Sequence, residues 1–292
     1  MARVYIFLSK WINLFRIRQW YKNLLIFLPL FFIAGIFDSQ NFFLTLLGFL
    51  CLCLVSSATY IINDLVDIKK DRLNPEKSLR PLAAGTIKTS SAIFVMLILL
   101  SGSLVLSYSL DFFFFLALCG IFLFGQLYTF WLKRIIFADI LTIATLFVIR
   151  AISGVFIIKV SISPWLILCP FFLSLFLSVG KRHSEQLLMG EKAMETRGVL
   201  KDYDPTLTNA LMIISTTLLV ASYALYSILS EHDYLILTLP FALFVIFRFF
   251  WLIQQGSLIA RHPERIVSDL GMVAGVLLWV IVTFLTIYLP IA

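Results

Sequence analysis

The sequence predicts an all-α membrane protein with nine transmembrane helices, and three observations lead to this prediction. The chain of 292 residues is 61% hydrophobic and only 13% charged, whereas soluble domains carry about 25% charged residues. Its apolar runs are continuous and about 20 residues long, which is the length of a membrane-spanning helix. Polar and apolar residues do not alternate within these runs, which excludes a transmembrane β-barrel.

The N-terminal segment, residues 1–19, is expected to form a helix on the membrane surface. Its apolar run at 4–8 is too short for a secretory signal, and no small-residue cleavage site follows it. Arg3, Lys10 and Arg16 fall on one arc of a helix whose other face is largely apolar. This distribution is typical of an amphipathic interfacial helix.

Nine apolar segments follow. We expect spans at residues 20–37, 41–62, 90–110, 112–132, 135–158, 162–180, 206–229, 234–252 and 269–289. The connections 63–89 and 181–205 are much longer than ordinary helix connections.

The basic residues predict the orientation of the chain in a plasma or inner membrane. With the N-terminus in the cytoplasm and the C-terminus outside, all but two of the 23 lysines and arginines fall in cytoplasmic segments or at span ends. The exceptions are Lys159, in an outer connection, and Arg150, within a span. Orientation therefore explains the net charge of +7, and we expect no nucleic-acid partner.

The loop 63–89 opens with closely spaced carboxylates. Asn63, Asp67 and Asp71 are four residues apart, and Asp64 lies seven before Asp71. If the preceding span continues as a helix, these side chains line one face. Carboxylates this close repel one another unless a cation neutralises them, and ligands that offer only oxygen select a hard ion such as Mg²⁺. We therefore expect Asp64, Asp67 and Asp71 to hold the metal, with Asn63 beside them.

The same loop continues with cations. Arg72, Lys77 and Arg80 follow the carboxylates, and such side chains can hold the phosphate oxygens that Mg²⁺ also binds. The combination predicts a metal–diphosphate site. A solvated, charged loop is the simpler interpretation, but it does not explain carboxylates at one-face spacing.

Two further groups of polar residues flank predicted spans. The stretch RIRQWYKN brings Arg18, Lys22 and Asn23 to the start of the first span, where they could hold a phosphate or anchor the chain at the interface. The stretch GKRHSEQ carries Lys181, Arg182 and Glu185, which could bind substrate or belong to a charged surface helix.

A third group lies around the predicted fifth span. Tyr128, Lys133, Arg134 and Asp139 lie at cytoplasmic ends of spans. Arg150 follows Asp139 by eleven residues, on the same helix face. An arginine in mid-span is either functional or the partner of a buried ion.

The stretch NDLVDIKKD resembles the NDxxDxxxD signature of the UbiA-type intramembrane prenyltransferases. The resemblance extends over the whole chain, 1–292, as a single transmembrane domain. It implies a ring of nine helices around a central cavity that opens to the membrane. It also implies a cytoplasmic active site that uses Mg²⁺ and a diphosphate substrate.

Typical members carry a second motif, DxxxD, after the sixth span, where this chain has KRHSE. Together with RQWYKN and IRAISG, this resembles a branch that transfers a 5-phosphoribosyl group from phosphoribosyl diphosphate to a polyprenyl (decaprenyl-type) phosphate in cell wall biogenesis. The resemblance then implies that Lys181, Arg182 and Glu185 hold the 5-phosphate end. One of two interchangeable pairs would bind the lipid phosphate: Arg18 with Lys22, or Lys133 with Arg134.

Two alternatives remain open. The first is a prenyltransferase that moves a prenyl chain from its diphosphate to an aromatic acceptor. The second is a transporter or a scaffold without catalysis. Transporters place ionisable residues near the bilayer midplane, whereas here only Arg150 does so.

Overall fold

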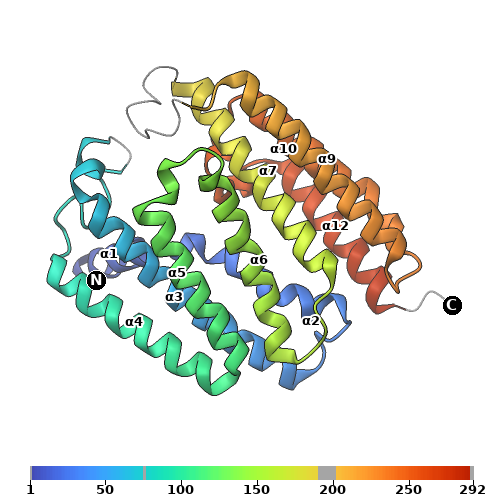
Figure 1. Ribbon diagram of the computed structural model, residues 1–292, viewed down its shortest axis with the longest axis horizontal. Helices are drawn as coiled ribbons and strands as arrows, with labels where there is room; N and C mark the ends of the chain where they lie inside the picture. The colour runs from blue at the N-terminus through green and yellow to red at the C-terminus, as the bar shows by residue number, and fades with distance from the viewer. Residues whose placement is uncertain (1, 75–76, 190–201, 290–292) are drawn as a thin grey trace. The chain divides into compact units, whose positions relative to one another are not determined.

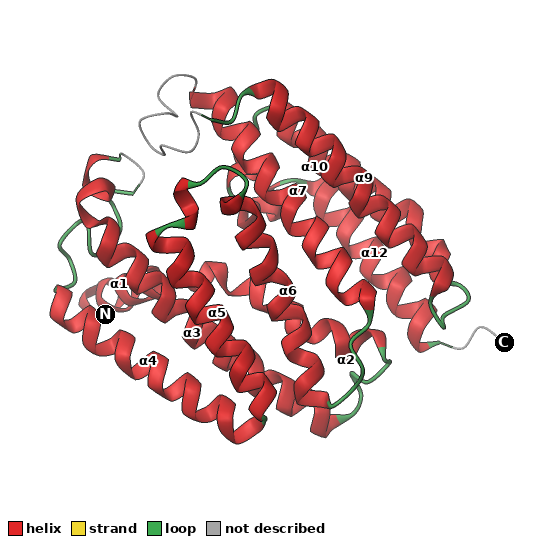
Figure 2. Ribbon diagram, in the orientation of Figure 1, coloured by secondary structure: helices red, strands yellow, loops and turns green. Residues whose placement is uncertain are grey.

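A computed structural model describes residues 2–74, 77–189 and 202–289. Within these ranges all regular secondary structure is helical, as Figure 2 shows, which confirms the all-α part of the predicted fold class. The chain divides into two compact units. Unit 1 consists of Met1–Phe31, Gly35–Trp131 and Ile149–Ser161, and unit 2 of Phe32–Ala34, Leu132–Val148 and Ile162–Ala292.

Unit 1 is built around the long helix α3. Its elements are α1 (Ala2–Phe15), η1 (Ile17–Phe27), most of α2 (Leu28–Phe32), α3 (Ser39–Leu73), α4 (Thr89–Leu110), α5 (Phe112–Phe130) and the second half of α6 (Ala138–Ile158). Helix α3 packs against both α4 and α5 (Figure 1). The predicted N-terminal helix is present as α1, and its Leu14 is buried against Ile61 of α3 and Ala92 of α4.

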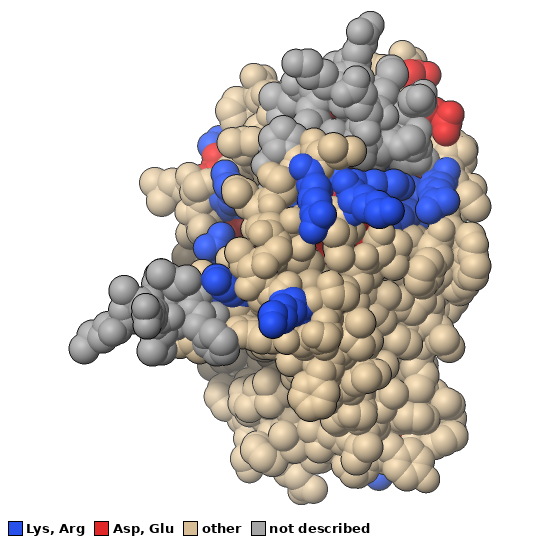
Figure 3. Space-filling model, turned by 90° about the vertical axis from the view of Figure 1, so that its left-hand side faces the viewer, with Lys and Arg blue, Asp and Glu red and all other residues tan. Residues whose placement is uncertain are grey.

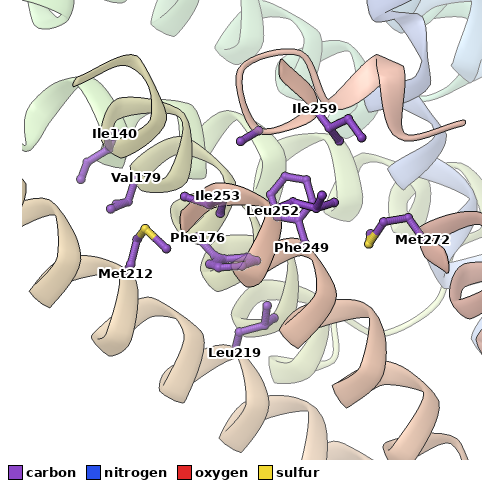
Figure 4. Packing of buried hydrophobic residues seen from close by; sticks show 11 residues of the cluster. Ile140, Phe176, Val179, Met212, Leu219, Phe249, Leu252, Ile253, Ile259 and Met272 are labelled. Atoms are coloured by element: carbon purple, nitrogen blue, oxygen red, sulfur yellow. The ribbon is translucent and has the colours of Figure 1, made fainter. Parts of the chain in front are cut away.

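Unit 2 contains the first half of α6 and the C-terminal helices. These are η2 (Leu132–Arg134), α7 (Pro164–Met189), α9 (Pro205–Leu229), η4 (Leu235–Thr238), α10 (Leu239–Gln254), α11 (Leu258–Arg261), η5 (Pro263–Ser268) and α12 (Leu270–Tyr288). Figure 4 shows its core, in which Phe176 of α7, Met212 of α9 and Phe249 of α10 converge.

Eight helical segments in the described ranges are long and apolar enough to cross a membrane. They are α3, α4, α5, α6, α7, α9, η4 with α10, and α12, and they correspond to the last eight predicted spans. The first predicted span, 20–37, differs from expectation. It is a 3₁₀ helix followed by the short α2, and the backbone of Ala34 then turns with a φ of 56°.

The 3₁₀ segment follows α3 in the opposite direction. Trp20 donates a hydrogen bond to Ser57 (3.2 Å), and Asn23 donates one to the Cys53 sulfur (3.3 Å). Ile26 lies against Gly48. The segment advances six residues from Trp20 to Ile26, while α3 covers the nine residues between Ser57 and Gly48. Nine residues of α-helix are about 13 Å long. That distance fits the rise of about 2 Å per residue of a 3₁₀ helix.

Two helices extend beyond the predicted spans and shorten the predicted loops. Helix α3 begins at its N-cap Asp38, which accepts hydrogen bonds from the amides of Gln40 and Asn41, and it continues to Leu73. Its 35 residues are about 52 Å long, against about 30 Å of hydrocarbon. Helix α7 likewise continues to Met189, so 181–189 is helical, not loop; residues 190–201 lie outside the described residues.

Candidate functional site: two carboxylate–arginine clusters

The acidic face of α3 is present as the spacing predicted. Because α3 remains helical through Leu73, Asp64 and Asp71 lie two turns apart on one face. Both are buried, with 2% and 4% of their surface exposed, and Asp67 is half-buried. Asn63 is also half-buried on this helix. Buried carboxylates are costly unless they are paired, so their partners define the site.

Arg80 connects the two buried carboxylates. Its Nη1 lies 3.1 Å from Asp64 Oδ1 and 2.7 Å from Asp71 Oδ2. The chain leaves α3 at Asn74, whose side chain accepts a hydrogen bond from the amide of Lys77, and turns back toward the helix. Arg72 holds the returning chain by donating a hydrogen bond to the carbonyl of Ala83 (3.1 Å). Of the predicted cations of this loop, Arg80 therefore lies beside the predicted carboxylates.

Arg16 is a partner of the predicted carboxylates that the sequence did not indicate. Its guanidinium pairs with Asp64 and lies over the ring of Tyr60, 4.9 Å from the centroid. It stands at the elbow between α1 and η1, with φ 51° and ψ 47°. For a non-glycine residue this left-handed conformation costs about 1–2 kcal/mol. Such strain persists where the surroundings hold it, and here Ser57 donates a hydrogen bond to the carbonyl of Phe15 (2.9 Å).

We call Arg16, Asp64, Asp71 and Arg80 the α3 cluster. Its two positive charges match its two negative charges, but its hydrogen-bonding capacity is not fully used. The side chains of Arg16 and Arg80 are 20% and 27% exposed, whereas those of Asp64 and Asp71 are 2% and 5% exposed. Asp64 Oδ2 is buried without a hydrogen-bond partner among the residues that the structure describes. The described ranges contain no group of three His, Cys, Asp or Glu side chains already arranged around a metal position.

A second cluster, in unit 2, also pairs an arginine with an aspartate, but here both partners are buried. Arg182 donates a hydrogen bond from Nε to Asp139 Oδ2 (3.0 Å), and its Nη2 lies 3.0 Å from the same oxygen. The hydroxyl of Tyr203 donates to Asp139 Oδ1 (2.7 Å) and accepts from the amide of Phe137 (3.0 Å). Glu185 lies 3.4 Å from Arg182 Nη1. We call Asp139, Arg182, Glu185 and Tyr203 the α7 cluster.

The α7 cluster is closed to ligands. Arg182 is 2% exposed, Tyr203 is 2% exposed and Asp139 is fully buried. Burial, and then the hydrogen bond to Asp139, raises the pKa of Tyr203 far above its usual value. The phenol therefore stays protonated and acts as a donor. Arg182 was predicted to contact a phosphate, but its guanidinium is engaged by carboxylates of its own chain, which indicates a structural ion pair.

Arg150 and Asp139 both lie on α6, eleven residues apart on one face as predicted, and each has its own partners. Arg150 donates a hydrogen bond to Asn23 Oδ1 (2.9 Å), and Ser56 donates to the same oxygen at 3.4 Å. Arg150 and Asn23 are both buried. These bonds link η1 to α3 and α6 within unit 1, which favours a structural role for both residues.

The other predicted residues lie nearer the surface. Lys22 donates a hydrogen bond to Gln19 (2.6 Å). Arg18, Arg72 and Arg134 are exposed, and Lys77, Tyr128, Lys133 and Lys181 are half-buried. In the view of Figure 3, lysine and arginine side chains form several separate groups, and most of the remaining visible surface is uncharged.

The fold and the α3 cluster together define a class of protein: a multi-pass helical membrane protein with a buried acidic helix face matched by arginines. Comparison with known families agrees, because the UbiA prenyltransferase family model matches residues 23–257. The chain belongs to the UbiA prenyltransferase family.

Individual relatives are more specific. The chain is 31% identical to the decaprenyl-phosphate phosphoribosyltransferase of Corynebacterium glutamicum, over 95% of this chain and 86% of that protein. It is 32% identical to the protein of the same name in Mycobacterium tuberculosis, over 73% and 72%. The structure of a UbiA homologue from Archaeoglobus fulgidus bound to GPP and Mg²⁺ has the same fold, with a TM-score of 0.72 and 21% identity. That match covers 93% of this chain and 99% of the other.

Proposed function

We propose that this protein transfers a 5-phosphoribosyl group from phosphoribosyl diphosphate to a polyprenyl phosphate and releases diphosphate. The observation that carries the proposal is the α3 cluster, since it offers buried carboxylates for a metal and partly exposed arginines for phosphate oxygens. Two relatives named decaprenyl-phosphate phosphoribosyltransferase, similar over most of the chain, support the choice of donor and acceptor.

The residues of α3 fit a magnesium ion. Asp64, Asp67 and Asp71 offer only oxygen atoms, and Oδ2 of Asp64 is a buried acceptor without a hydrogen-bond partner among the described residues. Hard divalent ions prefer such ligands. The UbiA homologue of Archaeoglobus fulgidus was solved with Mg²⁺. When bound, Mg²⁺ would neutralise charge on the diphosphate as it leaves.

The chain's own cations hold the donor. Arg16, Arg80 and Lys77 bind the diphosphate oxygens and stabilise the charge that grows as the bond to ribose C1 breaks. Lys181 binds the 5-phosphate, whereas Arg182, held by Asp139, fixes the helix that carries Lys181. Arg182 thus changes from the predicted ligand to a positioning residue in the proposed mechanism.

The acceptor needs no strong general base. A lipid phosphate is already anionic at neutral pH, and its oxygen attacks C1 on the face opposite to the leaving diphosphate. Arg18 with Lys22, or Lys133 with Arg134, holds this phosphate. Lys133 and Arg134 lie in η2, between the candidate spans α5 and α6, and Arg18 and Lys22 lie in the N-terminal half of η1.

We further propose that the site faces the cytoplasm and that the segment 17–32 is a ninth pass. Eleven residues of 3₁₀ helix and five of α2 span about 30 Å at rises of about 2.0 and 1.5 Å per residue, which matches the hydrocarbon core. The N-terminus then lies on the cytoplasmic side with the long connections, and the C-terminus lies outside. The ring arrangement of the nine helices stays a prediction.

Cysteine labelling tests this topology. In a background without the four native cysteines, Asp38→Cys and Lys159→Cys should react with an impermeant reagent added to intact cells. Lys10→Cys and Lys77→Cys should react only after permeabilisation. Labelling of Lys10→Cys from outside would mean that the segment 17–32 does not cross, and labelling of Lys77→Cys would place the α3 cluster on the wrong side.

A transfer assay tests the function itself. Purified protein, Mg²⁺, radiolabelled phosphoribosyl diphosphate and polyprenyl phosphate should give a labelled lipid and stoichiometric diphosphate. A parallel reaction with a prenyl diphosphate and an aromatic acid should give no product. The opposite pattern would assign the protein to the aromatic prenyltransferases, and no product in either reaction would favour a scaffold or transporter.

A further inference from the structure

The charges of Asp64 and Asp71 are already balanced by arginines of the same chain. Asp64 and Asp71 contribute two negative charges, and Arg16 and Arg80 contribute two positive ones. The carboxylates are nearly inaccessible, whereas the arginines are the more exposed partners. The exchangeable members of the α3 cluster are therefore its cations.

A divalent ion on its own gains little at this position. Arg16 and Arg80 already contact Asp64 Oδ1, and Arg80 also contacts Asp71 Oδ2, so a metal ion held by the remaining oxygens of these carboxylates would lie beside two guanidinium groups that repel it. A diphosphate changes the balance, because its oxygens offer each guanidinium a new bidentate partner. The carboxylates then become free for the metal at the moment when the anion arrives.

The surroundings of Arg16 suit such a change of partner. Its backbone is fixed at the elbow, since the preceding carbonyl of Phe15 accepts a hydrogen bond from Ser57. Its guanidinium lies over the ring of Tyr60, which provides a cation–π contact that does not depend on Asp64. Ser57, Tyr60 and Asp64 lie on one face of α3. An arginine kept in a conformation that favours glycine indicates that this side chain is needed there.

We infer that Arg16 and Arg80 are resident counter-ions that make metal binding at Asp64 and Asp71 conditional on a diphosphate. The arginines move from carboxylate to phosphate oxygens as the metal and the diphosphate enter together. The inference rests on the proposed function only in taking a diphosphate as the ligand, whichever group that diphosphate carries.

Equilibrium dialysis of the full-length protein in detergent tests this coupling, with Mn²⁺ as the metal and inorganic diphosphate as the anion. Free Mn²⁺ is set by a metal buffer, so that chelation by diphosphate does not distort the comparison. In the wild type, diphosphate should raise Mn²⁺ affinity at least about tenfold, which is about 1.4 kcal/mol. By reciprocity, Mn²⁺ should raise diphosphate affinity by the same factor.

Arg16→Gln is the decisive variant, because Arg80 still contacts both carboxylates and supports folding. It should bind Mn²⁺ alone several-fold more tightly than the wild type, and the gain from diphosphate should fall below about threefold. Arg16→Lys keeps the charge but loses the bidentate fork, so an intermediate coupling is expected. Lys69→Gln removes an exposed cation from the same helix and should behave as the wild type.

Three results overturn the inference: equal Mn²⁺ affinity with and without diphosphate in the wild type, wild-type coupling in Arg16→Gln, or loss of coupling in Lys69→Gln. If Arg16→Gln does not fold, wild-type coupling in Arg16→Lys contradicts it instead. These results are independent of the transfer assay. Turnover of a prenyl diphosphate would remove the proposed donor and leave the inference standing, since both donors carry a diphosphate.

Discussion

The α3 cluster and the α7 cluster use the same two side chains, aspartate and arginine, in opposite ways. In the α7 cluster, Arg182 and Asp139 are both buried, and both oxygens of Asp139 accept hydrogen bonds. In the α3 cluster the side chains of the arginines are 20% and 27% exposed, and Asp64 Oδ2 has no hydrogen-bond partner among the described residues. The exposure of the arginines and the number of carboxylate oxygens that accept hydrogen bonds, rather than the residue types, therefore distinguish an exchangeable site from a structural ion pair.

The largest expected effect is on catalysis at the α3 cluster. Asp71→Asn, like Asp67→Asn, should lower kcat at saturating Mg²⁺ by about 100-fold or more, as loss of a group that stabilises a leaving anion does elsewhere. The melting temperature in detergent should change little, because the amide keeps the shape of the carboxylate. Near-normal turnover of both variants would mean that these carboxylates have no role in catalysis. Lys70→Gln, on the exposed side of the same helix, is the control.

The second effect is on stability at the α7 cluster. Arg182→Gln leaves Asp139 buried without its main partner, and breaking one side of a buried ion pair costs about 3–5 kcal/mol. Thermal unfolding in detergent should show this loss. The double variant Asp139→Asn with Arg182→Gln should recover part of it, because no unpaired charge remains. If Arg182→Gln keeps wild-type stability but loses affinity for the 5-phosphate, the predicted ligand role is restored.

A smaller effect is expected where η1 touches α6. A Cβ on Gly154 would lie 2.1 Å from the carbonyl oxygen of Ile26, which is backbone and cannot rotate away. Gly154→Ala should therefore cost about 1–3 kcal/mol. A Cβ on Gly120 meets nothing within 4 Å, so Gly120→Ala should leave the melting temperature unchanged or slightly raised. Equal melting temperatures for the two variants would contradict the close approach of the 3₁₀ segment.

The smallest effect is a pH dependence at the start of α12. Asp269 accepts hydrogen bonds from Arg248 (3.0 and 3.1 Å) and from the amide of Met272 (2.8 Å). The bond from Arg248, followed by that from Met272, lowers the pKa of Asp269. Its stabilising contribution is therefore complete above the unfolded pKa of about 4 and is lost as the pH falls through the lowered folded value. Asp269→Asn should lower the melting temperature slightly at pH 6 and not at pH 3; equal differences at both values would exclude this origin.

Much of the fold and the position of the acidic face could be predicted from the sequence, because apolar runs and helical spacing can be read from it directly. Apolar runs located eight spans, and the spacing of Asp64 and Asp71 placed them on one face of a helix that does continue past Ile62. Hydropathy does not report rise per residue, so the 3₁₀ form of Ile17–Phe27 was not predicted.

The partners of the carboxylates were harder to predict. Arg16 lies 48 residues before Asp64 and reaches it through a left-handed elbow that no local pattern announces. The sequence placed Arg16 within the expected interfacial helix 1–19, whereas the helix ends at Phe15. Arg182 was predicted as a ligand from its charge, but charge alone does not reveal that Asp139 is 43 residues away in sequence and 3.0 Å away in space.

One measurement tests the contrast between the clusters most directly: the melting temperature of Arg16→Gln and Arg182→Gln, each with and without Mg²⁺ and inorganic diphosphate. Ligands that bind only the folded state raise the wild-type melting temperature. Arg16→Gln should melt close to the wild type without ligands, because Arg80 still contacts both carboxylates, and should lose most of the ligand-induced rise. Arg182→Gln should melt clearly lower and keep the rise. The reverse pattern, or equal behaviour of the two variants, would contradict the division into an exchangeable site and a structural ion pair.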